Sequence, residues 1–261
     1  MNILLVSLQI NVVEAYSYGL GYIAAVLKEH GHTVTQEIIR NPYTTVSAET
    51  LHRCKADIVG FSVLSSQMPY LQAQVNAVRK HSSAFIVCGG IHPTLDPESV
   101  FLIDGINALI RGYAEYPFLK LADAFREKTD YTNIESLWLR EEGGILKNSV
   151  APACSLTSLP FPDKDIFDYQ GLLNRAGGFN RFIFSRGCLF NCPYCSNKAL
   201  RDIYPVQAAP YSILEPHRAI EEIGRDASRF NFRVIFFDDD CITFNKDWFY
   251  EFFRLYKKSF S

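Results

Sequence analysis

Three cysteines in one short loop carry the clearest chemical signal in this 261-residue chain. The stretch "SRGCLFNCPYCSN" places Cys188, Cys192 and Cys195 at spacings of four and three residues. Three thiolates can bind a metal, but a structural zinc site needs a fourth ligand and usually a second cysteine pair. The remaining cysteines are scattered singly along the chain: Cys54, Cys88, Cys154 and Cys241. The loop therefore favours a metal centre with one open position over structural zinc, which remains an alternative.

Iron–sulfur chemistry suits this loop better than haem attachment. A c-type haem signature requires a histidine after the last cysteine, and Ser196 stands at that position. The spacing differs from the C-x2-C-x2-C run of bacterial ferredoxins, yet a cubane cluster can use three thiolates and leave its fourth iron open. Three structural thiols without a metal would repel one another and lose hydration on burial. An open iron would be a place to bind and activate a substrate.

A run of three aspartates, Asp238 to Asp240, forms a second candidate group. The run follows the strand-like stretch "RVIFF", which would direct it toward the mouth of a β/α barrel, where sites are built. Carboxylates at a strand end are also common as solvated turns or helix caps. Binding of Mg²⁺ is a less favoured use, because no phosphate-cradling loop lies nearby in the sequence.

Composition excludes several classes of partner and compartment. Lys and Arg number 26 against 28 Asp and Glu, a net charge of −2, so no basic field attracts nucleic acid or acidic membranes. The apolar start of the chain lacks a basic region and is too short for a signal peptide or a membrane span. Seven cysteines in a chain without an export signal indicate reduced thiols. We expect a cytoplasmic protein with no nucleic-acid partner and no membrane span.

The elements that must position these groups begin with a regular alternation of strand-like and helix-like segments. Apolar strands are predicted at 2–8, 32–39, 56–64, 84–90 and 106–112, with helices at 16–31, 47–55, 69–82 and 116–128. Strands buried on both faces and separated by helices predict a parallel, doubly wound α/β sheet. Residues 134–150 predict a hairpin that completes a Rossmann-like domain over residues 1–150. Ligands of such sheets sit at the carboxyl ends of the strands.

A second region follows a segment rich in Pro, Gly and Asp, which predicts a linker over residues 151–178. Residues 179–261 then predict a strand at 179–185, the thiol loop, a helix at 212–227, a strand at 232–240 and a helix at 246–258. This order is typical of the start of a β/α barrel or of another parallel sheet.

One rival motif lies near the N-terminus. Residues 19–24 fit the pattern G-x-G-x-x-A, and Glu37 lies about 15 residues further on, as in dinucleotide-binding proteins. The glycines of that fingerprint form a tight turn directly after the first strand, whereas about ten residues intervene here. We interpret these small residues as packing positions that let the helix approach the sheet.

The cysteine spacing, with the aromatic Tyr194 before the last cysteine and a strand before the loop, resembles the signature of radical S-adenosylmethionine enzymes. The resemblance implies a 4Fe-4S cluster on Cys188, Cys192 and Cys195, whose unique iron is chelated by the amino and carboxylate groups of S-adenosylmethionine. It also implies that the backbone of Tyr194 contacts the adenine. Asp239 or Asp240 would accept hydrogen bonds from the amino group of S-adenosylmethionine.

The stretches "SLPFPDKDIF" and "IFFDDDCITFNKDWF" resemble the cobalamin-binding subgroup of that family. Ser62 and Leu64 match its S-x-L element, and Gly89 and Gly90 match its G-G element, so the resemblance implies that the nucleotide tail of cobalamin threads past them. Read alone, these residues are also common in turns. The loop after the first strand lacks the cobalt-binding histidine of cobalamin mutases. His92 is the one histidine near the corrinoid-side strand ends, and we expect cobalt without a histidine ligand.

The resemblance implies a cobalamin-dependent radical S-adenosylmethionine enzyme with a 4Fe-4S cluster, S-adenosylmethionine and cobalamin as cofactors. Methyl transfer to an unactivated carbon through a 5′-deoxyadenosyl radical is the expected reaction, and radical cyclisation or ring rearrangement is the alternative. The expected partners are an external one-electron reductant and a small-molecule or natural-product-like substrate. The sequence assigns no catalytic residue.

The length of the second region suggests an incomplete barrel. A β/α unit takes about 30 residues, judged from about 250 for eight units. Residues 179–261 therefore hold two or three units, whereas the barrel of the resembling family has about six. We expect a truncated fragment of a longer enzyme, or a corrinoid- and iron–sulfur-binding module without independent turnover.

Overall fold

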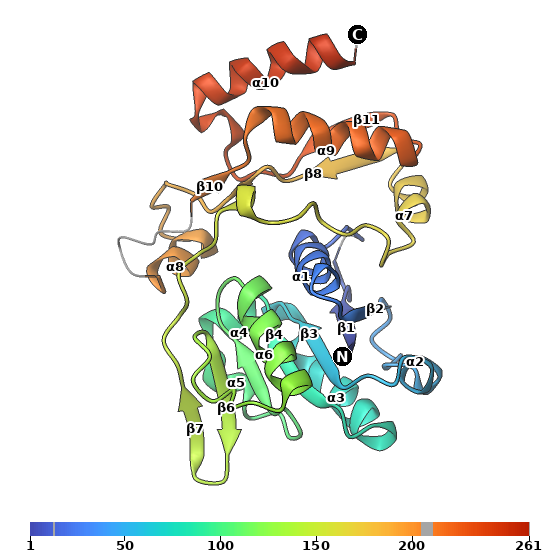
Figure 1. Ribbon diagram of the computed structural model, residues 1–261, viewed down its shortest axis with the longest axis vertical. Helices are drawn as coiled ribbons and strands as arrows, with labels where there is room; N and C mark the ends of the chain where they lie inside the picture. Colours follow the sequence, from blue (N-terminus) through green and yellow to red (C-terminus); the bar gives the residue numbers. More distant parts are fainter. Residues whose placement is uncertain (13, 205–210, 261) are drawn as a thin grey trace.

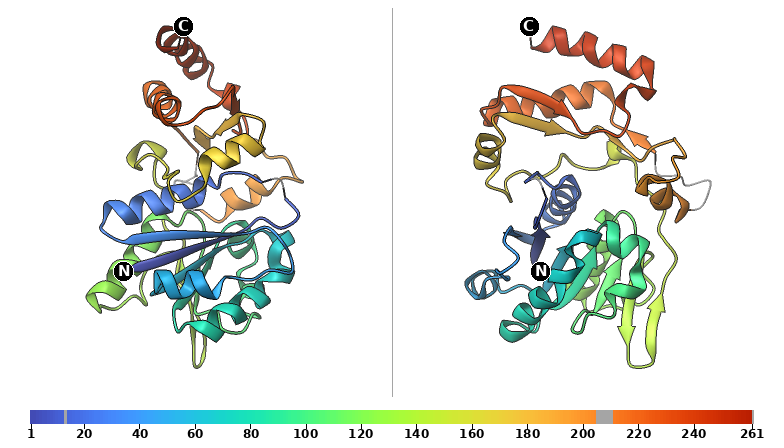
Figure 2. Two further views of the ribbon diagram at one scale, coloured as in Figure 1. Left: turned by 90° about the vertical axis from the view of Figure 1, so that its right-hand side faces the viewer. Right: turned by 180° about the vertical axis from the view of Figure 1, so that it is seen from behind.

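The computed structural model describes residues 1–12, 14–204 and 211–260, which form two lobes (Figure 1). The described residues of 1–150 form the lower lobe of Figure 1, and those of 179–260 form the upper one. The segment 151–178 runs from the hairpin of the lower lobe to the upper lobe, then passes between the two lobes (Figures 1 and 2).

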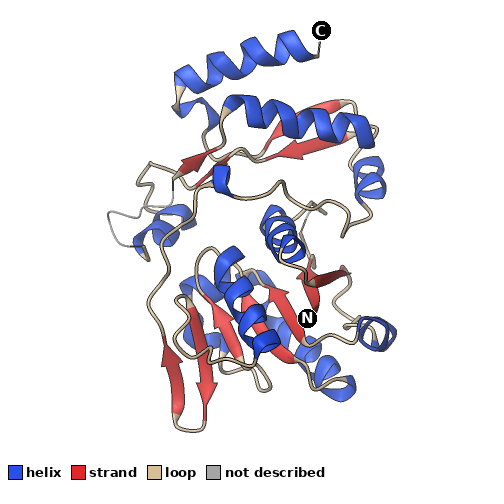
Figure 3. Cartoon of the chain, viewed as in Figure 1, coloured by secondary structure: helices blue, strands red, loops and turns tan. Residues whose placement is uncertain are grey.

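The lower lobe is built on a seven-stranded sheet in the order β2-β1-β3-β4-β5-β6-β7. The first five strands pair in parallel, and β6 and β7 add an antiparallel hairpin at one edge (Figure 3). The strands are β1 (Asn2–Leu8), β2 (Thr33–Ile39), β3 (Ile58–Ser62), β4 (Phe85–Gly89), β5 (Ala108–Ile110), β6 (Leu137–Glu141) and β7 (Gly144–Lys147). The predicted Rossmann-like α/β class is confirmed.

Helices cover both faces of this sheet, as a doubly wound fold requires. They are α1 (Tyr18–Glu29), α2 (Ala48–Cys54), α3 (Met68–His81), α4 (Ile91–Leu95), α5 (Pro97–Val100) and α6 (Glu115–Glu127). One core joins α1 and α6 to the face of β1 that carries Ile3 and Leu5. The other joins α2 and α3 to the face that carries Leu4 and Val6. Successive side chains of β1 enter opposite cores because a strand alternates its faces.

Among the glycines of α1, Gly21 has a packing role, and its neighbours are Tyr16 and Pro162 rather than the sheet. A Cβ atom on Gly21 would lie 1.8 Å from the Tyr16 hydroxyl oxygen and 3.2 Å from Pro162. A Cβ on Gly19 would meet no atom within 4 Å. Gly21 therefore lets Tyr16 and the 151–178 segment close on α1, and the expectation that these glycines let the helix approach the sheet was wrong.

The upper lobe contains two short sheets. Strand β8 (Phe179–Phe182) pairs in parallel with β11 (Val234–Phe237), and β9 (Ser185–Arg186) pairs antiparallel with β10 (Ser212–Ile213). Its helices are α8 (Ser196–Asp202), α9 (Pro216–Arg229) and α10 (Lys246–Ser259), and α9 packs against α10. Short 3-10 turns lie at Ser65–Gln67, Leu156–Ser158 and Ile242–Phe244.

Three expectations for the upper lobe need correction. The predicted strand 179–185 is divided into β8 and β9. The helix expected from residue 212 begins at Pro216, because Ser212 and Ile213 pair with β9. Helix α8, which begins directly after Cys195, was not predicted. In the described ranges, every helix is too short or too polar to cross a bilayer.

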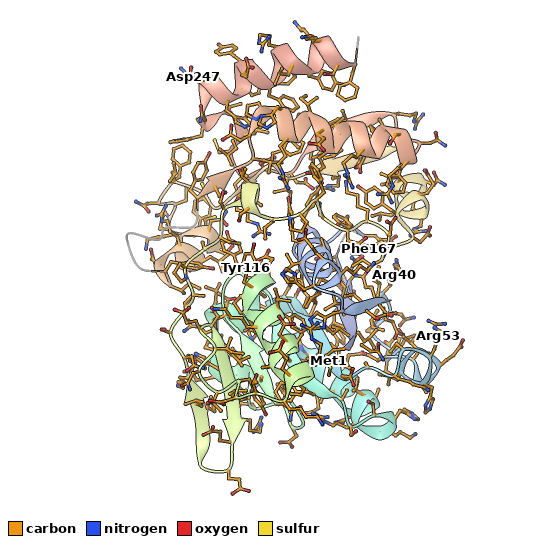
Figure 4. All side chains as sticks on the ribbon, in the orientation of Figure 1. Met1, Arg40, Arg53, Tyr116, Phe167 and Asp247 are labelled. Carbon is orange, nitrogen blue, oxygen red and sulfur yellow. The ribbon has the colours of Figure 1, made fainter. Side chains whose placement is uncertain are left out.

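The 151–178 segment, predicted as a linker, packs against α1, and we call it the strap. The Asp163 backbone carbonyl accepts a hydrogen bond from the Tyr16 hydroxyl at 3.0 Å, and the Asp163 amide donates to the Gly21 carbonyl at 3.0 Å. Phe167, labelled in Figure 4, packs against the Tyr16 ring with centroids 4.7 Å apart. The strap ends in α7 (Tyr169–Arg175). These contacts hold it against α1 where the lobes meet.

A buried lysine of the strap reaches the upper lobe. Lys164 forms an ion pair with Asp226 of α9 and lies 3.8 Å from Glu222 of the same helix. Its ammonium group lies 4.7 Å from the centroid of the Phe182 ring and 4.9 Å from that of Tyr169. All three charged side chains are at most 5% exposed. Lys164 therefore joins the strap to α9 through a charge network excluded from water.

Candidate functional site

A cavity of about 460 Å³ lies between the lobes. The lower lobe contributes the carboxyl ends of β3, β4 and β5, which is the edge where the sequence placed a ligand. The upper lobe contributes the ends of β8 and β11 together with β9. Members from the lower lobe include Ser62, Gly89, Gly90, Gly112 and Glu115, and those from the upper lobe include Ile183, Ser185, Arg186, Asp238, Asp239 and Asp240. The cavity is thus lined by two of the predicted site regions, the G-G element and the aspartate run.

The ends of β3 and β4 approach each other closely at the G-G element. The Val63 amide donates to the Gly89 carbonyl at 2.9 Å, and Gly90 has φ +106°. A Cβ on Gly90 would lie 2.9 Å from both the Val63 nitrogen and the Val63 oxygen. Ser62 and both glycines line the cavity, whereas Leu64 caps the following 3-10 turn and lies outside the lining. The residues lining this edge leave room that larger side chains would fill.

Replacing Gly90 with alanine is expected to lower the free energy of unfolding by about 1–3 kcal/mol, because a side chain there combines strained backbone with a clash. Gly143 is the matched control, since a Cβ at that hairpin position would meet no atom within 4 Å. Gly143→Ala should change the free energy by no more than about 0.5 kcal/mol. Urea denaturation of both variants measures the difference, and equal stabilities would refute the packing described for Gly90.

His92 does not reach the cavity. Its Nδ1 lies 3.0 Å from the Ser65 hydroxyl and its Nε2 lies 2.8 Å from the Ser99 hydroxyl. Both ring nitrogens are therefore engaged on the lower lobe. A role for His92 at a corrinoid has no support from this arrangement.

The thiol loop lies beside the cavity at the start of α8. Cys188, Cys192 and Cys195 are all partly exposed, and Cys188 lines a second cavity of about 250 Å³ that shares Gly90 and Tyr113 with the first. Across residues 1–12, 14–204 and 211–260, no three His, Cys, Asp or Glu side chains are gathered in a metal-binding arrangement. The thiols share one loop, and their chemistry suits an iron–sulfur cluster, but they do not converge on one point. The Tyr194 side chain is exposed.

The three aspartates have different surroundings. Asp238 forms an ion pair with Arg181 through two contacts of 2.5 and 2.6 Å. Asp239 accepts hydrogen bonds through Oδ1 from the Phe184 amide at 3.0 Å and the Ser185 hydroxyl at 2.5 Å. Asp240 is exposed at the cavity wall. Asp238 is thus paired with a side chain of β8, whereas Asp239 is fixed by a backbone amide and a hydroxyl at the junction of β8 and β9.

Asp239 is also the best-placed acceptor for a cationic group. Its Oδ2 is buried and has no hydrogen-bond partner among the described residues. Burial raises the pKa of this carboxyl group, and the hydrogen bond from the Ser185 hydroxyl opposes that rise. A buried carboxylate with one free oxygen gains from an ammonium neighbour. This geometry favours Asp239 over Asp240 among the two predicted candidates.

An ion pair between the lobes was missed from the sequence. Arg186 of β9 donates to Glu115, the first residue of α6, at 2.5 Å, and both line the cavity. The signals available were a charged residue directly after a predicted strand, Arg186, and one directly before a predicted helix, Glu115. Such residues are common at these positions, so the pairing could not be read without the fold.

Part of the lower lobe matches a known family profile. Residues 12–122 match the family profile described as B12 binding domain. The chain is 27% identical over 233 residues to an uncharacterised methyltransferase of Pyrococcus horikoshii, covering 87% of this chain and 49% of that protein. It is 24% identical over 245 residues to an anaerobic magnesium-protoporphyrin IX monomethyl ester cyclase of Cereibacter sphaeroides, covering 89% of this chain and 39% of the cyclase.

Solved structures extend the likeness over both lobes. The radical S-adenosylmethionine methyltransferase TsrM of Kitasatospora setae, with tryptophan substrate and a S-adenosylmethionine analogue, matches with a TM-score of 0.75 at 17% identity. That match covers 99% of this chain and 52% of TsrM. The cobalamin-dependent S-adenosylmethionine radical enzyme OxsB matches with a TM-score of 0.72 at 19% identity, covering 92% of this chain and 34% of OxsB.

These matches confirm the resemblance to cobalamin-dependent radical S-adenosylmethionine enzymes. The chain has the α/β fold of the corresponding parts of TsrM and OxsB. It spans about half or less of the length of the curated relatives described above.

Proposed function

We propose that this chain is part of a cobalamin-dependent radical S-adenosylmethionine enzyme that transfers a methyl group to a carbon of a small molecule. The observation that carries the proposal is the shared cavity. One wall is the glycine-lined sheet edge of the lobe matched by the B12 binding domain, and the other contains Asp239 and adjoins the thiol loop. A corrinoid and S-adenosylmethionine would therefore meet in one space.

The chain's own residues supply binding, orientation and exclusion of water. Gly89 and Gly90 leave the sheet edge open to the nucleotide tail of a corrinoid, and Ser62 offers a hydroxyl there. The three thiolates would hold a 4Fe-4S cluster, and Asp239 would accept the amino group of S-adenosylmethionine. When bound, these cofactors supply the one-electron chemistry and the methyl group, with an external reductant as electron source.

Asp239 has a defined part in this arrangement. Its Oδ1 is fixed by Phe184 and Ser185, so its Oδ2 keeps one direction relative to the cavity wall. An ammonium group bound there would keep the carboxylate ionised, because a nearby positive charge favours the charged form. The apolar walls around it, including Ile183 and Leu156, limit the access of water.

A radical cyclase is the second candidate. It is favoured by the likeness to the magnesium-protoporphyrin IX monomethyl ester cyclase, which covers 89% of this chain. The same cavity and cofactors would serve both reactions, so the choice depends on the substrate. A binding module that turns over only with further polypeptide is a third outcome.

The corrinoid part is tested with bound cob(II)alamin. We expect an electron paramagnetic resonance spectrum without nitrogen splitting, because no histidine of the described residues lines the cavity and both His92 nitrogens are engaged. His92→Ala should leave the spectrum unchanged. A triplet splitting that disappears in His92→Ala would contradict this binding mode, and failure to bind cobalamin would remove the functional proposal.

A further inference from the structure

The ion pair between Glu115 and Arg186 offers an unassigned ligand subsite. Glu115 begins α6 of the lower lobe and Arg186 ends β9 of the upper lobe, and their side chains are 3% and 11% exposed. Arg186 Nη2 donates to Glu115 Oε1 at 2.5 Å. Both residues line the 460 Å³ cavity. The pair is therefore buried in protein while bordering the proposed cofactor space.

The guanidinium of Arg186 is held in place before any ligand arrives. It lies 4.8 Å from the centroid of the Tyr22 ring and 4.7 Å from that of Tyr113. Tyr113 is itself stacked on Tyr204 with ring centroids 5.8 Å apart. Burial raises the pKa of Tyr113 to about 12, so this ring stays neutral at physiological pH. Two aromatic faces fix the orientation of a planar cation.

Each partner keeps one atom unused. Glu115 Oε2 and Arg186 Nη1 are both buried and have no hydrogen-bond partner among the described residues. A buried polar atom without a partner is costly, so a ligand that supplies one gains affinity. The pair thus presents one free acceptor and one free donor with no net charge.

We propose that this Glu115–Arg186 pair binds a primary carboxamide at the periphery of the corrinoid. A carboxamide can donate an N–H to Glu115 Oε2 while its carbonyl accepts from Arg186 Nη1. Cobalamin carries several primary amides around its ring. A carboxylate in the same place would be repelled by Glu115. This proposal rests on the proposed function, because it names the part of the corrinoid that this wall of the cavity recognises.

The test compares intact hydroxocobalamin with its singly hydrolysed derivatives, in each of which one ring amide is a carboxylate. Binding to the wild-type protein is followed by equilibrium dialysis. One derivative is expected to bind roughly tenfold more weakly than intact cobalamin, since a buried hydrogen bond is lost and a like charge is introduced. The other derivatives should bind within about threefold, because amides that face solvent contribute little.

The variant Glu115→Gln provides the rescue experiment. Glutamine keeps an acceptor for Arg186 and presents an N–H₂ group to a carboxylate. The weakly bound derivative should therefore bind about tenfold more tightly to Glu115→Gln than to the wild type. Glu37→Gln is the matched control, because Glu37 also has a buried unpartnered oxygen but does not line the cavity. Glu37→Gln should leave the difference in affinity between intact cobalamin and the weakly bound derivative unchanged.

The outcomes separate this proposal from the proposed function. If the wild type binds intact cobalamin and every derivative equally, the subsite is refuted while corrinoid binding stands. If it binds none of them, the proposed function fails instead. The wild-type comparison decides the question even if Glu115→Gln does not fold. An unchanged preference in a folded Glu115→Gln variant would also overturn the assignment.

Discussion

Replacing Cys188, Cys192 or Cys195 with alanine is expected to reduce bound iron from about four atoms per chain to nearly none, because each thiolate would hold one iron of the proposed 4Fe-4S cluster. The protein is reconstituted anaerobically with iron and sulfide, and iron content and visible absorption are measured. All three thiols are partly exposed in the loop before α8, so the substitutions should leave the core intact. Unchanged melting curves would confirm that the loss is local.

Cys241→Ala is the matched control for the cluster. Cys241 is partly exposed and follows the aspartate run at the end of β11, so it lies near the site without belonging to the loop. Its replacement should preserve the iron content. Loss of iron in Cys241→Ala would mean that a fourth thiolate closes the cluster and leaves no open iron for S-adenosylmethionine. Zinc without iron in the wild type would contradict the cluster itself.

Replacing Lys164 with methionine is expected to lower the free energy of unfolding by about 3–5 kcal/mol, because it leaves Asp226 and Glu222 buried without their cation. Methionine has a similar length and apolar character, so little packing is lost. Asp226 would keep only the hydrogen bond that the Asn180 amide donates to it at 2.9 Å. Urea denaturation measures the difference.

Lys28→Met is the matched control for Lys164. Lys28 contacts Asp163 of the same strap at 2.6 Å, but its side chain is 39% exposed. An exposed pair of this kind contributes no more than about 1 kcal/mol. If Lys164→Met and Lys28→Met lower the free energy of unfolding equally, the buried network of Lys164 stabilises the fold no more than an exposed ion pair, and the account of Lys164 is refuted. The double change Lys164→Met with Asp226→Asn should recover part of the loss, since it removes one buried charge.

The stability of the wild type should also depend on Glu222. Burial raises the pKa of this carboxyl group to about 7 from its ordinary value of 4.5, and the Lys164 charge only partly opposes that rise. Between about pH 4.5 and pH 7, the folded state therefore keeps a proton on Glu222 that the unfolded state has released. This contribution is present below pH 4.5 and is lost as the pH rises toward 7.

The lower lobe could be predicted well because its signals are local. Four of its five parallel strands are short apolar runs, and β2 combines Thr, Gln and Glu with Val and Ile. The upper lobe was harder, because β9 and β10 have two residues each and depend on pairing across the chain. No hydrophobic period marks a strand of that length.

The site was predictable where a motif has fixed spacing and not where it depends on tertiary pairing. The G-G element predicted from the sequence lines the cavity, and the predicted cysteine loop lies beside it, while the cofactor roles of both stay predictions. The strap contacts of Lys164 and the pair of Glu115 with Arg186 join residues more than 50 positions apart. These partners can be identified only in the folded protein. The same is true of the contacts of both His92 ring nitrogens with Ser65 and Ser99 in the lower lobe.

The central claim is that a corrinoid and an iron–sulfur cluster occupy neighbouring parts of one chain, and magnetic coupling between them tests it most directly. The protein is loaded with cob(II)alamin, its cluster is reduced, and the electron paramagnetic resonance spectrum is compared with those of the singly loaded forms. Because Gly90 lines the cavities on both the corrinoid and the thiol-loop side, we expect broadened or split signals in the doubly loaded protein. A spectrum equal to the sum of the two separate signals would contradict the account.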